Sequence, residues 1–315
     1  MKTNIILIGT GNIGKRHLQA ISNLSSVDRI TCYDTAEDAL ASVPEFCKSN
    51  NLNINNLVFS SDYGVLLQSI SDNTVVIIAT TAKGRGKLLE DVIRKAPLAI
   101  IAEKPLCQTL EEYEAIMKLS KTWNVPVYIN FARHMFSFYR DIHTTMKDAQ
   151  HKSLNAVFPD GMGCIGIHMF ELMTWLLSPK TYKIIHSSVE GVFKTKRKGY
   201  SDIYGSLVIL LDDTHLCSFT TSNKEKVFSI EISSGRKEYK IYEASQKMII
   251  SDILNNVNIH EVEILYVSQM TDKIVSDILE KRKTNKLPDV FQSYLAHKIL
   301  FDYMALNRKE KTNIT

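Results

Sequence analysis

The stretch Asn4-Ile-Ile-Leu-Ile-Gly-Thr-Gly-Asn-Ile-Gly14 decides the fold of the first half of this chain. Its apolar run is long enough for a buried strand and too short for a membrane span, and it leads directly into Gly9, Gly11 and Gly14. In a strand–turn–helix unit, the first glycine permits a tight turn, the second lets a pyrophosphate approach the backbone, and the third lets the helix pack closely. Unpaired N–H groups at the helix N-terminus then face the anion. The spacing therefore predicts a dinucleotide site.

An acidic residue completes this motif. Asp34 lies twenty positions past Gly14, at the end of a second apolar run, where its carboxylate can accept hydrogen bonds from the adenosine ribose hydroxyls. A carboxylate repels a 2′-phosphate and no Arg follows Asp34 directly, so NAD is favoured over NADP. The residues predicted to bind the cofactor at this motif are Gly9, Gly11, Asn12, Ile13, Gly14 and Asp34.

Length and composition exclude several classes of protein. The 315 residues suffice for two domains, and 44% apolar with 23% charged residues is ordinary for a globular protein. The net charge of +4 is mild and no basic face with interleaved aromatics appears, so no nucleic-acid partner is expected. The five cysteines form no CxxC pair, which argues for a reducing compartment and against a structural metal site. No signal peptide or apolar membrane span is evident, so we expect a cytoplasmic protein without a membrane partner.

Strand-like and helix-like segments alternate in the first half of the chain. The strands are continuous apolar runs, as expected of a parallel sheet that is covered on both faces. The predicted fold class is therefore α/β, with an N-terminal Rossmann doubly wound parallel sheet. Strands are expected near 4–8, 29–33, 56–59, 74–79, 98–102 and 126–129, and helices at 12–24, 36–42, 62–70, 84–95 and 109–122.

The pattern changes after Asn130. Helices are expected over 131–149, 164–177 and 289–307, and short runs divided by turns between about 182 and 250 predict an antiparallel sheet in a second, α+β domain. One such turn is Ser222-Asn223. The basic cluster Lys194-Thr-Lys-Arg-Lys198 fits either a solvated hairpin end or a patch for a phosphorylated or nucleotide-linked sugar. The expected domains are 1–130, the nucleotide-binding domain, 131–288, the substrate and oligomerisation domain, and 289–315, a C-terminal helix packing back near the nucleotide-binding domain.

A second informative stretch is Ala102-Glu103-Lys104-Pro105-Leu106, which follows the fifth strand. It therefore lies at the carboxyl edge of the sheet, where open α/β sheets bind their ligands. A lysine there could act as acid or base toward a substrate hydroxyl. A solvated lysine in a Pro-containing turn is the alternative.

Together these features resemble the glucose–fructose oxidoreductase, inositol dehydrogenase and MocA (Gfo/Idh/MocA) family. The resemblance implies a second domain with a large open antiparallel sheet that forms homodimers or homotetramers. It also implies that Lys104 exchanges the proton of a substrate hydroxyl and that His168 hydrogen-bonds that hydroxyl. Thr80 would lie near the cofactor ribose or phosphates, and Glu103 near the nicotinamide ribose. The matching residues are Gly9 to Gly14, Asp34, Ala79-Thr80-Thr81, Glu103-Lys104-Pro105, Asn130, Arg133 and Gly166-Ile-His168.

The chain departs from the family pattern on its substrate side. Cys164 stands where the family usually has Asp, and Asp160 could substitute for it or simply form a turn before Gly161. The residues predicted to face the substrate are Arg133, Asp160, Cys164 and His168, with no metal. The leading hypothesis is hydride transfer between NAD and a secondary hydroxyl of a sugar, inositol or nucleotide-sugar. Two alternatives stay open: an NAD-binding sensor or partner protein without turnover, and an enzyme that uses retained NAD for a transient oxidation.

Overall fold

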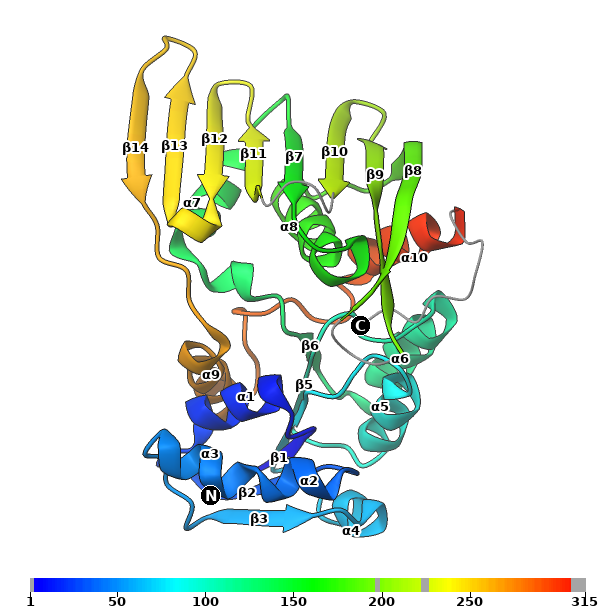
Figure 1. Ribbon diagram of the computed structural model, residues 1–315, viewed down its shortest axis with the longest axis vertical. Coiled ribbons are helices and arrows are strands. Elements are labelled where there is room, and N and C mark those ends of the chain that lie inside the picture. Colours follow the sequence, from blue (N-terminus) through cyan, green and yellow to red (C-terminus); the bar gives the residue numbers. More distant parts are fainter. Residues whose placement is uncertain (1–2, 196–198, 222–226, 307–315) are drawn as a thin grey trace. The chain divides into compact units, whose positions relative to one another are not determined.

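A computed structural model describes residues 3–195, 199–221 and 227–306 (Figure 1). The chain forms two compact units, each built from two stretches of sequence. Unit 1 comprises residues 1–135 and 265–291, and unit 2 comprises residues 136–264 and 292–315. The sequence had assigned 265–288 to the second domain, whereas the structure returns this segment to unit 1.

Unit 1 is built on a six-stranded sheet with the order β3-β2-β1-β4-β5-β6. All its neighbouring strands are parallel, and the central ones are fully covered: no residue of Ile5–Ile8 or Val75–Ile78 is more than 1% exposed. The strand order reverses beside β1, the strand that leads into the glycine turn. Open α/β sheets bind their ligands at such a reversal of strand order. The predicted doubly wound sheet is confirmed. Its strands are β1 (Thr3–Ile8), β2 (Val27–Tyr33), β3 (Leu57–Ser60), β4 (Thr74–Ile78), β5 (Ala99–Ala102) and β6 (Val127–Ile129).

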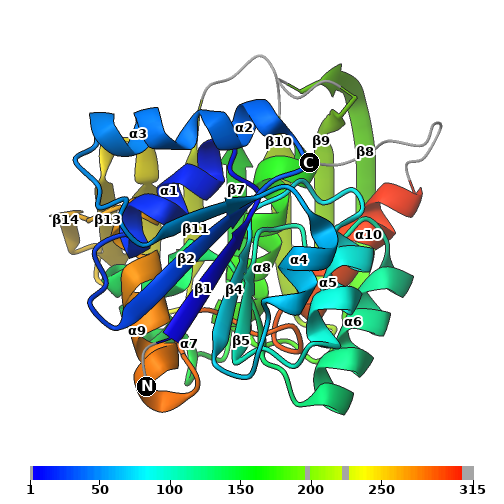
Figure 2. The same cartoon turned by 90° about the horizontal axis from the view of Figure 1, so that it is seen from below.

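Helices cover both faces of this sheet. Figure 2 shows α1 and α3 on one face and α5 and α6 on the other. Local sequence sets several helix starts: the side chains of Asp62 and Thr109 cap α4 and α6 by accepting hydrogen bonds from backbone N–H groups. The helices are α1 (Asn12–Ile21), α2 (Glu37–Ala41), α3 (Val43–Ser49), α4 (Tyr63–Gln68), α5 (Arg85–Ile93) and α6 (Leu110–Trp123), and the 3₁₀ turn η1 (Ala132–Met135) ends the first stretch.

The returning segment of unit 1 was not predicted as such. It forms the 3₁₀ turn η4 (Val267–Gln269) and helix α9 (Thr271–Lys281), both of which pack against α1. Farther along, the N–H of Ile129 donates to the carbonyl of Pro288 at 3.0 Å, and the N–H of Val290 donates to the carbonyl of Val127 at 2.8 Å. These bonds occupy the free edge of β6, which an unpaired parallel sheet would leave exposed.

Unit 2 contains an eight-stranded sheet with the order β14-β13-β12-β11-β7-β10-β9-β8. Every pair is antiparallel except β7 and β10, so the predicted large antiparallel sheet is confirmed. Figure 1 shows these strands side by side. They are β7 (Ser153–Phe158), β8 (Tyr182–Lys194), β9 (Ser201–Leu211), β10 (His215–Thr221), β11 (Ser229–Ser233), β12 (Lys237–Tyr242), β13 (Lys247–Asp252) and β14 (Val257–Glu261), with the 3₁₀ turn η3 (Glu243–Ser245) before β13.

The helices of unit 2 are α7 (Ser137–Met146), α8 (Ile167–Leu177), which follows a π-helical turn η2 (Met162–Gly166), and α10 (Tyr294–Leu306). Helix α8 packs against both α7 and α10. The sequence had placed the last helix near the nucleotide-binding domain, whereas α10 packs within unit 2, because its apolar residues Ile299, Leu300 and Tyr303 are buried there. The predicted turn at Ser222-Asn223 and residues 196–198 of the basic cluster lie outside the described residues.

Candidate dinucleotide and proton-transfer site

The glycine turn has the geometry that its spacing predicted. Gly9 has a φ of +94°, a left-handed conformation that disfavours side chains, and a Cβ there would lie 2.9 Å from the backbone of Ala79 and Thr80. A Cβ on Gly14 would lie 1.9 Å from the carbonyl oxygen of Gly9. These two glycines therefore let the end of β1, the start of α1 and the end of β4 approach one another.

Gly11 has a different role from the other two. A Cβ on Gly11 would meet no atom within 4 Å, so packing does not require a glycine at this position. Gly11 is the N-cap of α1, which has no side-chain cap and no acidic residue in its first turn. No capping side chain therefore accepts hydrogen bonds from the first N–H groups of α1. This end of the helix suits an anion. Asn12 and Ile13, the first residues of α1, belong to the same helix end.

Asp34 ties the glycine turn to the end of β2. Its Oδ2 accepts hydrogen bonds from the N–H of Thr10 at 2.7 Å and the hydroxyl of Thr10 at 3.2 Å, and its Oδ1 accepts from the N–H of Ala36 at 3.0 Å. An ionised carboxylate has about four acceptor positions, so capacity is left for a ribose hydroxyl. Asp34 is thereby held in place before any ligand arrives.

A cleft of about 460 Å³ opens beside Gly9 and Asp34. Tyr63 forms part of its wall and donates a 2.9 Å hydrogen bond to Asp91, which Lys87 also contacts at 2.7 Å. The hydrogen bond from Lys87 is the main cause of the lowered pKa of Asp91, while burial raises the pKa of Tyr63. The cleft is therefore large enough for the adenosine end of a dinucleotide, and its largely apolar wall suits the adenine ring. The polar group formed by Tyr63, Lys87 and Asp91 was not predicted.

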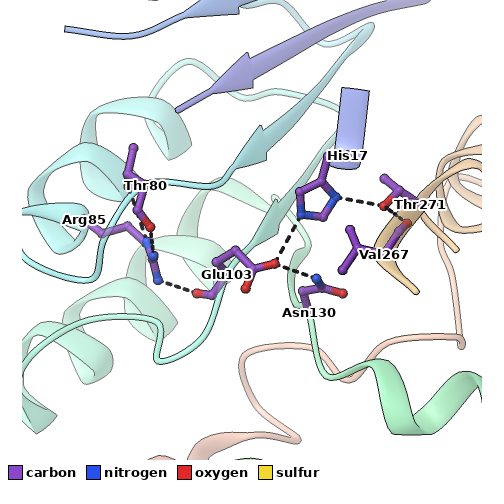
Figure 3. Close-up of polar contacts among 7 residues, drawn as sticks. All are labelled: His17, Thr80, Arg85, Glu103, Asn130, Val267 and Thr271. Atoms are coloured by element: carbon purple, nitrogen blue, oxygen red, sulfur yellow. Dashed lines mark hydrogen bonds and ion pairs between the residues drawn. The ribbon is translucent and has the colours of Figure 1, made fainter. Parts of the chain in front are cut away.

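Arg85 joins the end of β4 to the segment after β5 (Figure 3). Its side chain is 2% exposed. The guanidinium donates to the carbonyl oxygens of Thr80 and Glu103, and to that of Pro105 at 2.6 Å. Both residues that flank Lys104 are therefore held by one buried cation. Lys104 itself, half-buried, lies between them.

The side chain of Glu103 is held from another direction. Its Oε1 lies 3.2 Å from Nε2 of His17 and accepts a 2.6 Å hydrogen bond from the amide of Asn130. Burial alone would raise the pKa of Glu103, but the hydrogen bond and charge of His17, the amide of Asn130 and the charge of Lys104 outweigh burial and lower it to about 2. Glu103 is therefore a carboxylate at neutral pH. The sequence placed Glu103 at the site but did not indicate its partner His17.

The residues of unit 2 that were predicted to face the substrate lie around the π-helical turn η2. Cys164 belongs to η2, and His168, half-buried, lies in the first turn of α8. Asp160 has an exposed side chain and a φ of +64°, and its carbonyl accepts a hydrogen bond from the hydroxyl of Thr221. Asp160 thus forms the turn that precedes Gly161.

A different carboxylate occupies the start of η2. Asp202 of β9 is fully buried and accepts 2.8 Å hydrogen bonds from the N–H groups of Gly163 and Cys164. A Cβ on Gly161 would lie 2.0 Å from this carboxylate, so a glycine is required there. Asp202 was missed because it opens a strand-like run, where an acidic residue is ordinarily solvent-facing. The alternation of β9 gives no signal for it either, because the buried positions from Ile203 onward are odd-numbered and Asp202 departs from that pattern.

The structure brings Gly9, Gly11, Gly14, Asp34, Thr80 and Glu103 together in unit 1, on neighbouring strand ends. Arg133 also lies in unit 1, buried within η1. Asp160, Cys164 and His168 gather in unit 2. In the part of the chain that the structure describes, no three His, Cys, Asp or Glu side chains form a metal-binding group, and none of the helices is both long and apolar enough to cross a membrane.

Unit 1 is thus a Rossmann domain whose glycine turn, strand-end acid Asp34 and lysine-bearing segment lie at one edge of the sheet. Residues 3–131 match the family model GFO_IDH_MocA, described as "Oxidoreductase family, NAD-binding Rossmann fold". The match covers the parallel sheet of unit 1 from β1 to β6. The resemblance stated from the motifs and the prediction of NAD as cofactor are both confirmed. No curated protein matches the chain.

Solved structures show that the two-unit fold occurs elsewhere. An oxidoreductase from Agrobacterium radiobacter, in complex with NAD+, L-tartaric acid and magnesium, has a TM-score of 0.77 at 13% identity, covering 98% of each chain. A UDP-N-acetylglucosamine 3-dehydrogenase from Acidithiobacillus ferrooxidans has a TM-score of 0.75 at 11% identity, covering 97% of each chain. A dehydrogenase from Clostridium difficile has a TM-score of 0.73 at 15% identity, covering 97% of this chain and 100% of that one. At these identities the similarity concerns the fold.

Proposed function

We propose that the protein is an NAD-dependent oxidoreductase that transfers hydride between the cofactor and a secondary hydroxyl of a sugar, inositol or nucleotide-sugar. One observation carries the proposal: Lys104 lies between Glu103 and Pro105, which buried partners hold at the same sheet edge as the glycine turn. A lysine fixed in this way has the residue type and location that acid–base chemistry beside a dinucleotide requires.

The residues of unit 1 fit the cofactor. The start of α1 would hold the pyrophosphate, Asp34 the adenosine ribose, and Thr80 a ribose or phosphate oxygen. The space beside Gly11 is open, and a side chain at this position would fill it. Because glycine has no side chain, a ligand can approach the backbone closely there. When bound, NAD supplies a hydride acceptor or donor at its nicotinamide ring.

In the oxidative direction, the neutral amine of Lys104 would take the proton of the substrate hydroxyl. The carbon that bears the hydroxyl would lose its hydrogen together with the bonding electron pair, and a carbonyl would form. His168 would hydrogen-bond the hydroxyl oxygen, and Arg133, Asp160 and Cys164 would contribute to substrate binding. The amine thus accounts for the proton, and hydride transfer to the cofactor accounts for the hydrogen and both of its bonding electrons.

Two observations support a sugar-like substrate. The fold is shared with a UDP-N-acetylglucosamine 3-dehydrogenase and with an oxidoreductase bound to tartaric acid, a compound with two secondary hydroxyls. The polar and half-buried character of Lys104 and His168 suits a hydroxyl-rich ligand. We also propose a cytoplasmic location, in keeping with five free cysteines, and a homodimer or homotetramer.

The test is turnover by the purified full chain with a panel of polyols, sugars and nucleotide-sugars, followed by nicotinamide absorbance. We expect Lys104→Met to lower kcat by about 100- to 10,000-fold, the usual worth of a general acid or base. Lys95→Met, at an exposed lysine that follows α5, is the matched control and should retain wild-type activity. Equal activity of the wild type and Lys104→Met would overturn the assignment of Lys104.

A second function is favoured by Cys164, which replaces the carboxylate of the family pattern. A protein that binds NAD without turnover, as a sensor or partner subunit, would tolerate this loss. Cys164→Asp separates the two functions, because a gain of dehydrogenase activity indicates a degenerate enzyme, whereas a fully active wild type excludes the sensor. A third possibility, transient oxidation by retained NAD, predicts that the cofactor copurifies with the protein in stoichiometric amount.

A further inference from the structure

His17 is a buried histidine for which the hydride transfer proposed above has no role. It lies on α1, one turn past Gly14, and is 1% exposed. Figure 3 shows its ring between Thr271, at the start of α9, and Glu103, which precedes Lys104. Its Nδ1 lies 2.8 Å from the Thr271 hydroxyl oxygen and its Nε2 lies 3.2 Å from Oε1 of Glu103. Both ring nitrogens are therefore engaged.

The hydroxyl of Thr271 lies against one of the ring nitrogens. Its oxygen is 2.8 Å from Nδ1 of His17 and 3.2 Å from the carbonyl oxygen of Val267, which also accepts from the N–H of Met270. A hydroxyl can donate to Nδ1 or accept from it, so Thr271 holds the ring in place in either case.

Glu103 determines the proton on Nε2. The Oε1 of Glu103 already accepts from the amide of Asn130, and a carboxylate offers only acceptor atoms. The Nε2 of His17 must therefore carry a hydrogen and donate it to Glu103.

We propose that His17, which donates from Nε2 to Glu103 and is held in place by Thr271, is a positioning residue for Lys104. The kinetic part of this inference rests on the function proposed above. Its structural part, the Nε2 hydrogen and the partners of His17, does not.

Positioning follows from what surrounds Lys104. The side chain of the preceding residue is held by His17 and Asn130, and the carbonyls on both sides of Lys104 are held by Arg85. The start of the lysine side chain is therefore fixed by two buried side chains on two helices, His17 on α1 and Arg85 on α5. Misplacement of a reacting group by about 1 Å can cost about 100-fold in rate, so this support matters for catalysis. Thr271 extends the support to α9.

Breaking the His17–Glu103 contact is more damaging than its net contribution to stability would suggest. Removal of His17 leaves the buried Glu103 carboxylate without one of its hydrogen-bond donors, which is unfavourable in a region of low polarity. We expect the Glu103 side chain to move toward solvent in response. The backbone of Lys104 would lose one of its two anchors.

The first test is nitrogen NMR of the full-length wild-type protein, labelled at histidine ring nitrogens, at pH 7.5. The expected spectrum shows a hydrogen on Nε2 of the His17 ring, a signal that disappears in His17→Gln. A His17 ring whose Nε2 carries no hydrogen would overturn the inference. Because this measurement needs no turnover, it decides the Nε2 hydrogen even if the protein proves to have no dehydrogenase activity.

The second test compares the kinetics of three variants. His17→Ala should lower kcat by about 10- to 100-fold and leave the KM for NAD within about threefold of wild type. His17→Gln, whose amide can still donate to Glu103, should recover about tenfold of that loss. His297→Gln is the matched control, because His297 is a fully buried histidine of unit 2, and it should keep wild-type kcat. Wild-type kcat in His17→Ala, or an equal loss in the control, would contradict a positioning role.

Discussion

The N–H of Thr10, inside the glycine turn, donates a 2.7 Å hydrogen bond to the carboxylate of Asp34, at the end of the neighbouring strand. This bond joins the two parts of the dinucleotide motif, which are twenty-four residues apart. The acid therefore has two tasks, to shape the turn and to recognise a ribose. Each task gives a measurable consequence.

Asp34→Ala should weaken NAD binding and reduce discrimination against NADP. The carboxylate is lost as a ribose acceptor, and its repulsion of a 2′-phosphate disappears. We expect the NAD Kd to rise by about 10-fold or more, which corresponds to about 1.4 kcal/mol. The ratio of the NADP and NAD Kd values should fall. Calorimetric titration with both dinucleotides measures this, with Asp38→Ala as the control because Asp38 is exposed on α2. An unchanged NAD Kd would remove Asp34 from the site.

Gly11→Ala and Gly14→Ala should fail in different ways. The open space around Gly11 accommodates a methyl group, so Gly11→Ala should fold with wild-type stability but lose NAD affinity by at least about tenfold. In Gly14→Ala the methyl group collides with the backbone of Gly9, so the domain should lose about 1–3 kcal/mol of stability. Thermal unfolding and NAD titration of both variants separate the two effects. If Gly11→Ala binds NAD normally, the pyrophosphate does not approach the backbone there.

The stability of unit 1 should depend on pH through Glu103. The pKa of Glu103 is about 2 in the folded state, against an ordinary value of 4.5. Because the folded-state pKa is lowered, the stabilisation is fully present above pH 4.5 and is lost as the pH falls from 4.5 toward 2. The contribution is about 3 kcal/mol at most. Denaturant unfolding of the wild type and Glu103→Gln should therefore show a stability difference at pH 6 that shrinks by pH 3. A difference that stays constant over this range would contradict the lowered pKa.

Gly161→Ala should destabilise unit 2. The added Cβ would lie 2.0 Å from the Asp202 carboxylate, which would have to leave the N–H groups of Gly163 and Cys164. Loss of hydrogen bonds to a buried charge predicts a cost of about 1.5–3 kcal/mol. Gly191→Ala is the control, because a Cβ there meets nothing within 4 Å. Equal stability of the two variants in chemical denaturation would show that Asp202 can adapt.

Much of unit 1 was predictable because its signals are local. The apolar runs that end at Ile8 and Ile78, the glycine spacing and the capping residue Thr109 each act within a few residues. The strands and helices they predict occur within a few residues of their expected bounds. In unit 2 the strand β7 was not predicted, because Ser153–Phe158 is short and contains Asn155, although it lies in the interior of the sheet between β10 and β11.

The sequence by itself determined that this chain carries a strand–turn–helix cradle for a dinucleotide and a lysine at the adjoining edge of the sheet. Backbone conformation and strand order follow from neighbouring residues, so these features can be inferred without a structure. Only the tertiary structure decided that His17 meets Glu103, 86 residues away, and Thr271, 254 residues away. It also decided that Asp202 meets the start of η2. Such contacts depend on how separate elements pack together, and no local pattern in a single sequence encodes which buried polar groups will face one another.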